Sequence, residues 1–398
     1  MRVRKPASVQ LVQKKTRGGL PEDFDLLEFA KKIVSAHQTE NDFVDEDEIE
    51  DEEEYTPPVA TSKNTSIVPR ASSVVTPSQP KPEKKESGYA DMPWYDPSLS
   101  DTDAEIIYLY GKGMSMSDIV SLMKKSHGMD LHVNNISGII EKIYPLVKDW
   151  QARPLSSCYP ILYLDAMQFR VKEEGKSGSK VAYIALGFNI DGQKDVLGIW
   201  VAQTEGAKFW IHVLQELKDR GVQDILITCV DGLPGFPEAI RAVFPRSEVQ
   251  VCIVHMIRKT LMRVAHKDRE RFAAELKYVY TASNDESALE CLDQMEKDWP
   301  QYAVFLKNWR NNWTNLTPFF NYPASVRQMI YTTNIIESLN SQFRRATKTK
   351  PGFANDSALI KLLWLIQADI SSKWRVTARN WGTIIGELSY LFPERLKF

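Results

Sequence analysis

Two aspartates stand at the ends of apolar runs, and they are the residues whose type and spacing most clearly suggest chemistry. The run ILYLD ends at Asp165, and the run ILITCVD ends at Asp231. Because the carboxyl ends of adjacent parallel strands meet at one edge of a sheet, we expect the two carboxylates to lie close together. Carboxylates at short range repel each other unless they are protonated or bridged by cations. The pair therefore suggests a metal site, although either aspartate alone is more often a turn or helix-cap residue.

The metal chemistry that suits such a pair is that of two divalent ions about 3.5–4 Å apart. In nucleases and polymerases these ions activate an oxygen nucleophile and stabilise the leaving oxygen. Oxygen ligands favour Mg²⁺ or Mn²⁺ over zinc. We therefore expect two Mg²⁺ or Mn²⁺ ions as cofactors.

A third carboxylate would complete the site, and Glu337 in the segment TTNIIESLNSQFRR is the candidate. On a helix, this segment divides into an apolar stripe and a polar stripe, so that one face can pack while the other points at phosphates. The apolar stripe holds Ile335, Ile336, Leu339 and Phe343, and the polar stripe holds Asn334, Glu337, Ser341 and Arg344. A structural alternative remains, since Asn334 followed by Glu337 has the spacing of a capping box.

Cys252 and His255 form a CxxH pair at the end of the last predicted strand. A zinc site would need two more ligands, and no second pair is placed to supply them. We therefore expect the pair to brace the core by packing and hydrogen bonding. The chain also lacks a P-loop and a Gly-x-Ser-x-Gly turn, which disfavours nucleotide hydrolysis and serine hydrolase chemistry.

Short apolar runs bounded by turn signals predict the strands that position these residues. The runs cover residues 159–165, 181–190, 195–203, 224–231 and 248–255. A helix is predicted over residues 206–221, between the third and fourth runs. Three strands, a helix, a strand, a helix and another strand predict an α/β fold with a mixed sheet. Beyond His255 the sequence is mainly helical, with clear helical periodicity over 332–348 and 357–374.

Ahead of the sheet, residues 101–150 divide into three short helical pieces separated by glycine-containing turns. This spacing suggests a helix-turn-helix, although a plain three-helix scaffold fits equally well. The third piece is expected to begin at Asn134 or Asn135, which are good N-cap residues. If it is a recognition helix, Asn134, Asn135 and Ser137 would reach base edges or phosphates.

The first 95 residues differ in composition from the rest of the chain. Residues 42–54 hold ten acidic side chains and no basic ones, and a tract rich in Pro, Ser, Thr and Lys follows. Such a segment cannot bury enough apolar surface to offset its ordering entropy, so we expect it to be largely disordered, apart from a short amphipathic helix within 21–37. The acidic run also masks a net positive charge in the rest of the chain. Of the whole chain's 50 basic and 52 acidic residues, 50 basic and 42 acidic lie outside it. This basic excess is compatible with nucleic acid as a partner, and equally with an ordinary solvated surface.

The four cysteines lie far apart without a CxxC pair, which argues against a disulfide framework. No apolar run is long enough to cross a membrane, and no apolar stretch of signal-peptide length follows the basic start. We therefore expect a cytoplasmic protein with no membrane partner.

Taken together, these stretches resemble the bacterial Mutator-type insertion-sequence transposases. The resemblance covers residues from about 101 to 398 and rests on YPILYLDAMQFRV, EGAKFWIHVLQELKDRGVQDILITCVDGLPGFPEAI, QVCIVHMIR, IYTTNIIESLNSQFRR, Lys373-Trp374 and Asn380-Trp381. Residues 1–95 match nothing in the family, whose members usually have basic, folded sequence there.

The resemblance implies a ribonuclease H-like fold with an Asp-Asp-Glu catalytic triad at Asp165, Asp231 and Glu337. The family's CxxH signature falls on Cys252 and His255. It also implies a function: binding of the element's terminal inverted repeats, cutting of a 3′ end with water, and joining of the freed hydroxyl to target DNA. Arg344, Arg345 and Lys348 would then contact phosphates, although surface solubility explains them equally well.

The implied organisation is a small helix-turn-helix-like domain (96–150) after the disordered region (1–95), a first part of the core (155–265), a helical insertion (266–330) and a completion of the core (331–398). A homo-oligomer on DNA at the bacterial nucleoid is implied as well. Two alternatives remain open, which are a domesticated relative that binds DNA without cutting and a host ribonuclease H-like nuclease.

Overall fold

The computed structural model describes residues 88–173, 176–331, 334–348, 350, 352–374 and 376–396. The acidic run and the amphipathic segment at 21–37 lie outside the described residues. Residues 88–95, which we expected to be disordered, are instead packed against the first described helix. Trp94 is 3% exposed, and the ring of Tyr89 lies 5.5 Å from that of Tyr108. The folded part therefore begins ahead of residue 96, because these aromatic side chains supply the apolar surface that the preceding tract lacks.

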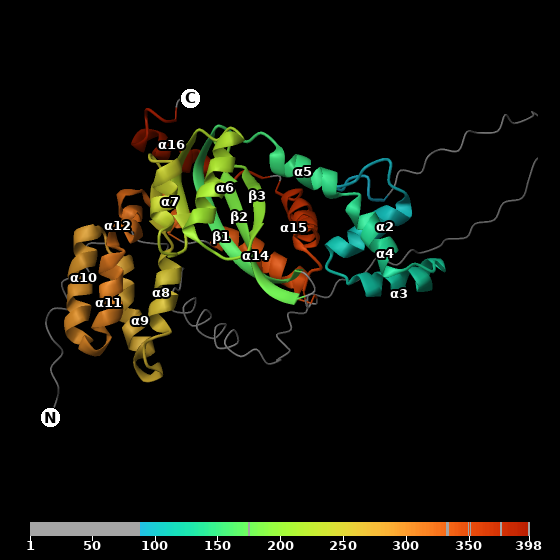
Figure 1. Ribbon diagram of the computed structural model, residues 1–398. Coiled ribbons are helices and arrows are strands. Elements are labelled where there is room, and N and C mark those ends of the chain that lie inside the picture. The colour runs from blue at the N-terminus through green and yellow to red at the C-terminus, as the bar shows by residue number, and fades with distance from the viewer. Residues whose placement is uncertain are drawn as a thin grey trace, which may run out of the picture.

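A five-stranded mixed sheet lies at the centre of the molecule (Figure 1). The strands are β1 (Cys158–Glu173), β2 (Lys176–Phe188), β3 (Lys194–Ala202), β4 (Asp224–Val230) and β5 (Glu248–Val251). Their order is β3-β2-β1-β4-β5. The first three form an antiparallel meander, while β4 and β5 run parallel to β1. The mixed sheet predicted from the sequence is confirmed.

Helices cover both faces of the centre of the sheet. Residues 161–164 of β1 are all buried, which requires cover on both sides of the strand. The crossover from β3 to β4 is made by α6 (Ala207–Asp219), and that from β4 to β5 by α7 (Phe236–Val243). In α6 the buried stripe is Trp210, Val213, Leu214 and Leu217, and the helix is followed by Gly221 at φ 110°.

The strand β1 is longer than its apolar run predicts. It continues past Asp165 to Glu173 and pairs with β2 over that whole length. Beyond Asp165 the strand alternates, with Met167, Phe169 and Val171 buried and the residues between them exposed. A strand covered on one face alternates in this way, so a search for continuous apolar runs ends too early. Asp165 therefore lies within β1 and not at its end.

The last strand is shorter than predicted. β5 ends at Val251, and α8 (Ile253–Leu261) takes over the last three residues of the range 248–255 that we assigned to a strand. Cys252 is the N-cap of this helix, and His255 lies in its first turn. The run VCIVH is apolar enough for either element, and a short apolar run alone does not distinguish them.

After α8 the chain forms short helices before the glutamate segment. These are α9 (His266–Tyr280), α10 (Asp285–Asp298), η3 (Pro300–Tyr302), α11 (Ala303–Asn311), α12 (Trp313–Leu316), η4 (Pro318–Asn321) and α13 (Ala324–Ile330). Helices α9, α10 and α11 pack side by side away from the sheet (Figure 1). An aromatic cluster of Phe272, Trp299 and Tyr302 lies among them, and Trp309 Nε1 donates to Thr260 Oγ1 of α8 at 2.9 Å.

Three further helices complete the core: α14 (Asn334–Thr347), α15 (Asp356–Ser371) and α16 (Trp381–Leu391). Helix α14 packs on β1, and α15, which is buried along most of its length, packs on β3. The helix α16 returns to the sheet, where Trp381 stacks on Phe188 with 5.6 Å between ring centroids.

The N-terminal helices are α2 (Asp101–Gly111), α3 (Met116–His127), α4 (Val133–Glu141) and α5 (Tyr144–Ala152). The glycine stops are as predicted, with Gly128 at φ 66° as the C-cap of α3. The predicted N-cap of the third piece is wrong by two or three residues, because His132 holds that position and Asn135 accepts its backbone N–H at 2.9 Å. These helices pack on α15, where Lys112 pairs with Asp369 at 2.9 Å.

A substitution in the turn between β2 and β3 would test how closely α16 packs against this turn. Gly192 adopts φ 75°, and a Cβ on it would lie 2.3 Å from Cγ of Trp381. Gly192→Ala is expected to lower the free energy of unfolding by on the order of 2–4 kcal/mol, from left-handed strain and overpacking together. Thermal and urea unfolding would measure this loss.

A matched control is Gly386→Ala in α16, where an added Cβ meets nothing within 4 Å. This change is expected to stabilise the protein by about 0.5–1 kcal/mol, as alanine does in an open helical position. Equal stability of the two variants would contradict the close packing of Trp381 on the turn.

Candidate active site

The two aspartates occupy neighbouring positions on parallel strands. The ladder between β1 and β4 ends with Leu164 opposite Val230, so Asp165 and Asp231 are the next residue on each strand. Adjacent strands lie about 4.8 Å apart, which brings the two side chains to one edge of the parallel half of the sheet. Both side chains are half-buried. The arrangement matches the juxtaposition expected from the sequence, although Asp165 arrives there from the middle of a strand.

Glu337 joins the site from α14 and faces the beginning of α8. Its Oε1 lies 3.5 Å from Nε2 of His255, and its Oε2 lies 4.0 Å from Nη2 of Arg258. Asn334 is the first residue of α14, and Glu337 lies in the first turn of this helix. The carboxylate of Glu337 is directed toward the basic helix α8.

The carboxyl group of Asp165 shows that the three acids share one electrostatic environment. The pKa of Asp165 is raised to about 6, mainly by burial and in part by the charges of Asp231 and Glu337, while the Ala166 N–H and His255 oppose the rise. Asp165 Oδ1 accepts the Ala166 N–H at 2.8 Å, and Oδ2 accepts Nδ2 of Asn340 at 2.6 Å. A bound cation would relieve the repulsion between the three carboxylates.

Cys252 and His255 brace the site. Cys252 is fully buried, and burial raises the pKa of the neighbouring Cys229 well above its usual range, with Cys252 adding to the effect. Burial alone would lower the pKa of His255, but Cys252, Glu337 and Asp165 outweigh it and raise the value to about 9. Nδ1 of His255 is buried and meets no atom in hydrogen-bond geometry within the described part of the chain, and the side chain of Cys252 contributes most to the rise in the pKa of His255. All four cysteines are free.

Sequence reasoning missed four polar residues around the site. Glu205 follows β3, and desolvation together with the charges of Asp231 and Asp165 raises its pKa to about 7. Lys259 Nζ lies 3.7 Å from the position that a Cβ on Gly232 would take, next to Asp231. Arg258 and Asn340 contact Glu337 and Asp165 as described above. Arg258 lies three residues after His255, and Asn340 lies three residues after Glu337. Helical periodicity applied to these motifs would have placed both residues near the site, but it does not give their hydrogen-bond partners.

The donor set suits Mg²⁺ or Mn²⁺, since Asp165, Asp231 and Glu337 offer only oxygen. Within the described residues, no three or more His, Cys, Asp or Glu side chains are grouped closely enough to hold a metal ion. Glu337 is drawn toward His255 and Arg258, and Asp165 is held by Asn340. Glu337 would therefore have to turn away from α8 for all three carboxylates to share a cation site.

The predicted DNA contacts lie on the surface. Asn134, Asn135 and Ser137 are exposed at the start of α4, and Arg344, Arg345 and Lys348 are exposed on or directly after the last turns of α14. The two groups belong to different elements, one of which carries Glu337. Since Asn135 closes the N-terminus of α4 through its side chain, only Asn134 and Ser137 remain free of a capping role.

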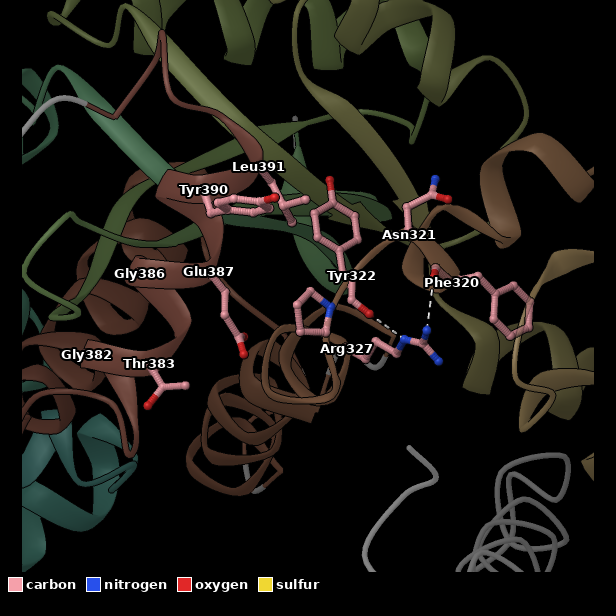
Figure 2. A pocket seen from close by; sticks show the side chains of 11 residues that line it. Phe320, Asn321, Tyr322, Arg327, Gly382, Thr383, Gly386, Glu387, Tyr390 and Leu391 are labelled. Atoms are coloured by element: carbon pink, nitrogen blue, oxygen red, sulfur yellow. Dashed lines mark hydrogen bonds between the residues drawn. The ribbon is translucent and has the colours of Figure 1, made fainter. Parts of the chain in front are cut away.

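A cavity of about 670 Å³ lies elsewhere, between α13, η4 and α16 (Figure 2). Its lining includes Tyr322, Arg327, Glu387 and Tyr390, and none of the three carboxylates. Figure 2 shows the guanidinium of Arg327 donating to the backbone oxygens of Phe320 and Tyr322, so this cation serves the local backbone. The chemistry at the sheet edge is therefore separate from this hollow.

Comparison with known proteins identifies the family of this chain. Residues 92–377 match the model of the Mutator family of transposases. The chain is 42% identical over 303 residues to the transposase for insertion sequence element ISRM3 of Rhizobium meliloti, covering 76% of each chain. It is 37% identical over 318 residues to a probable insertion-sequence transposase of Corynebacterium diphtheriae, covering 75% of this chain and 93% of that one. The chain belongs to the Mutator family of transposases.

A more distant relative is the transposase for insertion sequence element IS256 in transposon Tn4001 of Staphylococcus aureus. It is 25% identical over 281 residues, and the match covers 70% of this chain and 72% of the relative. Among solved structures, the Drosophila P element transposase strand transfer complex aligns with 72% of this chain and 94% of that one, at 9% identity and a TM-score of 0.35. No helix among the described residues is long and apolar enough to span a membrane.

The raised pKa of His255 yields a test of the site's electrostatics. In metal-free protein, Glu337→Gln removes a charge that favours the imidazolium, so the pKa of His255 is expected to fall from about 9 toward its ordinary value. Proton NMR titration of the histidine rings would measure the shift. The exposed His212 serves as an internal control and should not respond.

The same shift predicts how stability depends on pH. A histidine whose pKa is higher in the folded chain contributes its full stabilisation below the unfolded value near 6.5 and loses it as the pH rises through about 9. The difference in the free energy of unfolding between wild type and His255→Gln should therefore shrink from pH 6 to pH 9.5. A difference that is constant over this range would contradict a charged His255.

Proposed function

We propose that this protein is the DNA transposase of an insertion sequence and that Asp165, Asp231 and Glu337 form its Asp-Asp-Glu triad on a ribonuclease H-like sheet. The observation that supports this most strongly is the register of β1 and β4, which sets Asp165 beside Asp231 in a chain that belongs to a transposase family. Glu337 lies within electrostatic range of Asp165. The two most similar relatives named above are transposases or probable transposases of insertion sequences.

The reaction consists of two in-line displacements at phosphorus, first by water and then by a DNA 3′ hydroxyl. Two Mg²⁺ ions, when bound, would activate the attacking oxygen and stabilise the leaving one. The carboxylates of Asp165 and Asp231 would hold the ions where the ladder between β1 and β4 ends, and Glu337 would complete the site from α14. The same constellation serves both steps, since each exchanges one oxygen for another on a phosphodiester.

The basic residues of α8 suit the charge of the substrate. Arg258 and Lys259 lie on the same helix as His255, beside Glu337 and the loop after Asp231. Phosphates that enter the site would meet these cations, which offset the repulsion between the acidic triad and the DNA backbone. Arg344, Arg345 and Lys348 would continue this basic surface along α14.

Terminal inverted repeats and target DNA are the proposed partners, and a homo-oligomer on DNA would bring two element ends together. The protein would act at the bacterial nucleoid. A DNA-binding relative without cutting activity has no need of three carboxylates in one electrostatic environment. A host nuclease would share the triad, but it would not use a DNA 3′ hydroxyl as nucleophile.

The central prediction is that Asp165→Asn, Asp231→Asn and Glu337→Gln each abolish cleavage and strand transfer. Each change removes one negative charge from the cation site while preserving the size of the side chain, so the developing charge on phosphate is less stabilised. The measurement is cleavage and joining of labelled element ends in Mg²⁺, with DNA binding and thermal melting of the same preparations.

A matched control is Asp219→Asn, which changes an exposed carboxylate at the end of α6. It should leave cleavage and joining unaltered. Near wild-type joining by a folded Glu337→Gln protein would exclude the triad. Cleavage without joining by the wild-type protein would instead favour a nuclease.

The capping contact of Asn135 determines which residues of α4 to change in a test of whether this helix recognises the ends of the element. The double variant Asn134→Ala with Ser137→Ala leaves the capping contact of Asn135 intact and is expected to weaken binding of element ends more than binding of random DNA. Titrations at two salt concentrations would separate base contacts from the salt-dependent phosphate contribution. An equal loss for both DNAs would contradict base recognition by this helix.

A further inference from the structure

We propose that Asn340 is a positioning residue of the cleavage site, whose side-chain amide fixes the Asp165 carboxylate in the orientation that binds a cation. The inference rests on the proposed function, and it adds a residue outside the acidic triad. Asn340 acts through Asp165 and does not itself touch the reacting atoms.

The contact is short and enclosed. Nδ2 of Asn340 donates to Oδ2 of Asp165 at 2.6 Å, and the asparagine side chain is only 1% exposed. The other carboxylate oxygen accepts the backbone N–H of Ala166 at 2.8 Å. Each oxygen of Asp165 is therefore tied to one donor, which restricts rotation of the carboxylate about its side-chain bond. The remaining lone pairs of both oxygens stay available to a cation.

The side-chain oxygen of Asn340 indicates that the stability of the fold does not by itself account for an asparagine at this position. Oδ1 of Asn340 is buried and has no hydrogen-bond partner within the described part of the chain. An ionised carboxylate only accepts hydrogen bonds, so Nδ2 has to face Asp165, and Oδ1 then points away from it. A buried acceptor without a partner is unfavourable, and a leucine of similar shape would avoid it. The donor function of the amide toward Asp165 is what accounts for an asparagine at this position.

The position on α14 couples two of the three carboxylates. Asn340 lies three residues after Glu337, so both side chains project from neighbouring positions on the same helix. Leu339 and Phe343, which flank Asn340 on this helix, are buried and fix the helix against the core. The helix that delivers Glu337 thus also sets the orientation of Asp165, and His255 and Arg258 contact Glu337 from the opposite side.

The test compares Asn340→Leu with the wild-type full-length protein. In EDTA the variant is expected to fold and to melt near the wild-type temperature, because removal of the unpartnered Oδ1 offsets the loss of the donor to Asp165. The Mg²⁺ concentration for half-maximal cleavage of labelled element ends should rise about 10–100-fold, as for other residues that orient a metal ligand. Much of the rate should return at high Mg²⁺. A second measurement does not depend on catalysis. Thermal melting is recorded at increasing Ca²⁺ concentration, and the Ca²⁺ concentration that gives half of the maximal rise in melting temperature should increase in parallel.

Two further variants keep the outcome decisive. Gln342→Leu makes a similar exchange of an amide for leucine at an exposed position of α14 and should match wild type in both assays. Asn340→Ser is smaller than asparagine and cannot overpack, and its hydroxyl is too short to reach Asp165, so it should also need more Mg²⁺ and more Ca²⁺.

A folded Asn340→Leu protein with the wild-type dependence on both ions would overturn the inference. Failure of both Asn340 variants to fold would overturn it too, because the residue would then serve the core. If Asp165→Asn and Glu337→Gln cleave like wild type, the proposed function fails instead, and the Ca²⁺ titration still decides whether Asn340 orients Asp165.

Discussion

The parallel pairing of β1 with β4 is the constraint on which the site depends. The ladder ends with Leu164 opposite Val230, and the next residue on each strand is an aspartate. Both strands are apolar up to that point, so the sheet buries them and leaves the first polar residue of each at the edge. A register shift of one residue would turn one aspartate to the other face of the sheet. Packing of the strand interiors therefore fixes the separation of the carboxylates without any direct bond between them.

Gathering carboxylates in this way is electrostatically unfavourable, and the surrounding elements reduce the cost. The pKa of Asp165 rises to about 6 through burial and its acidic neighbours, and that of Glu205 rises to about 7 for the same reasons. The opposing charges come from a single helix, since His255, Arg258 and Lys259 all lie on α8. The buried Cys252 begins this helix directly after β5, and its N–H donates to Val230 O at 2.8 Å. The CxxH pair thus anchors a row of cations next to the acidic edge.

Sequence reasoning predicted the order of the elements and the residues of the candidate site, and it failed where one pattern is compatible with two structures. The sequence of strands and helices along the chain and the meander followed from continuous apolar runs and turn signals. The extension of β1 did not, because residues 166–173 alternate and carry charges that suit an exposed loop equally well. VCIVH was assigned to a strand because four apolar residues before a histidine fit either element. Asn340 was overlooked because its hydrogen-bond partner lies 175 positions away in the chain. Such long-range partners cannot be deduced from local periodicity.

The helix α14 connects the site to the rest of the molecule. Its buried stripe rests on the core, Glu337 faces α8, Asn340 faces β1, and its far end approaches the N-terminal helices, where Gly113 would bring a Cβ to within 2.6 Å of Ala346 O. Lys350, just beyond the helix, donates to Met114 O at 2.9 Å. The N-terminal helices therefore contact the same helix that carries Glu337 and Asn340. Because close-packed elements resist independent movement, the position of α14 depends on this contact as well as on its packing against β1.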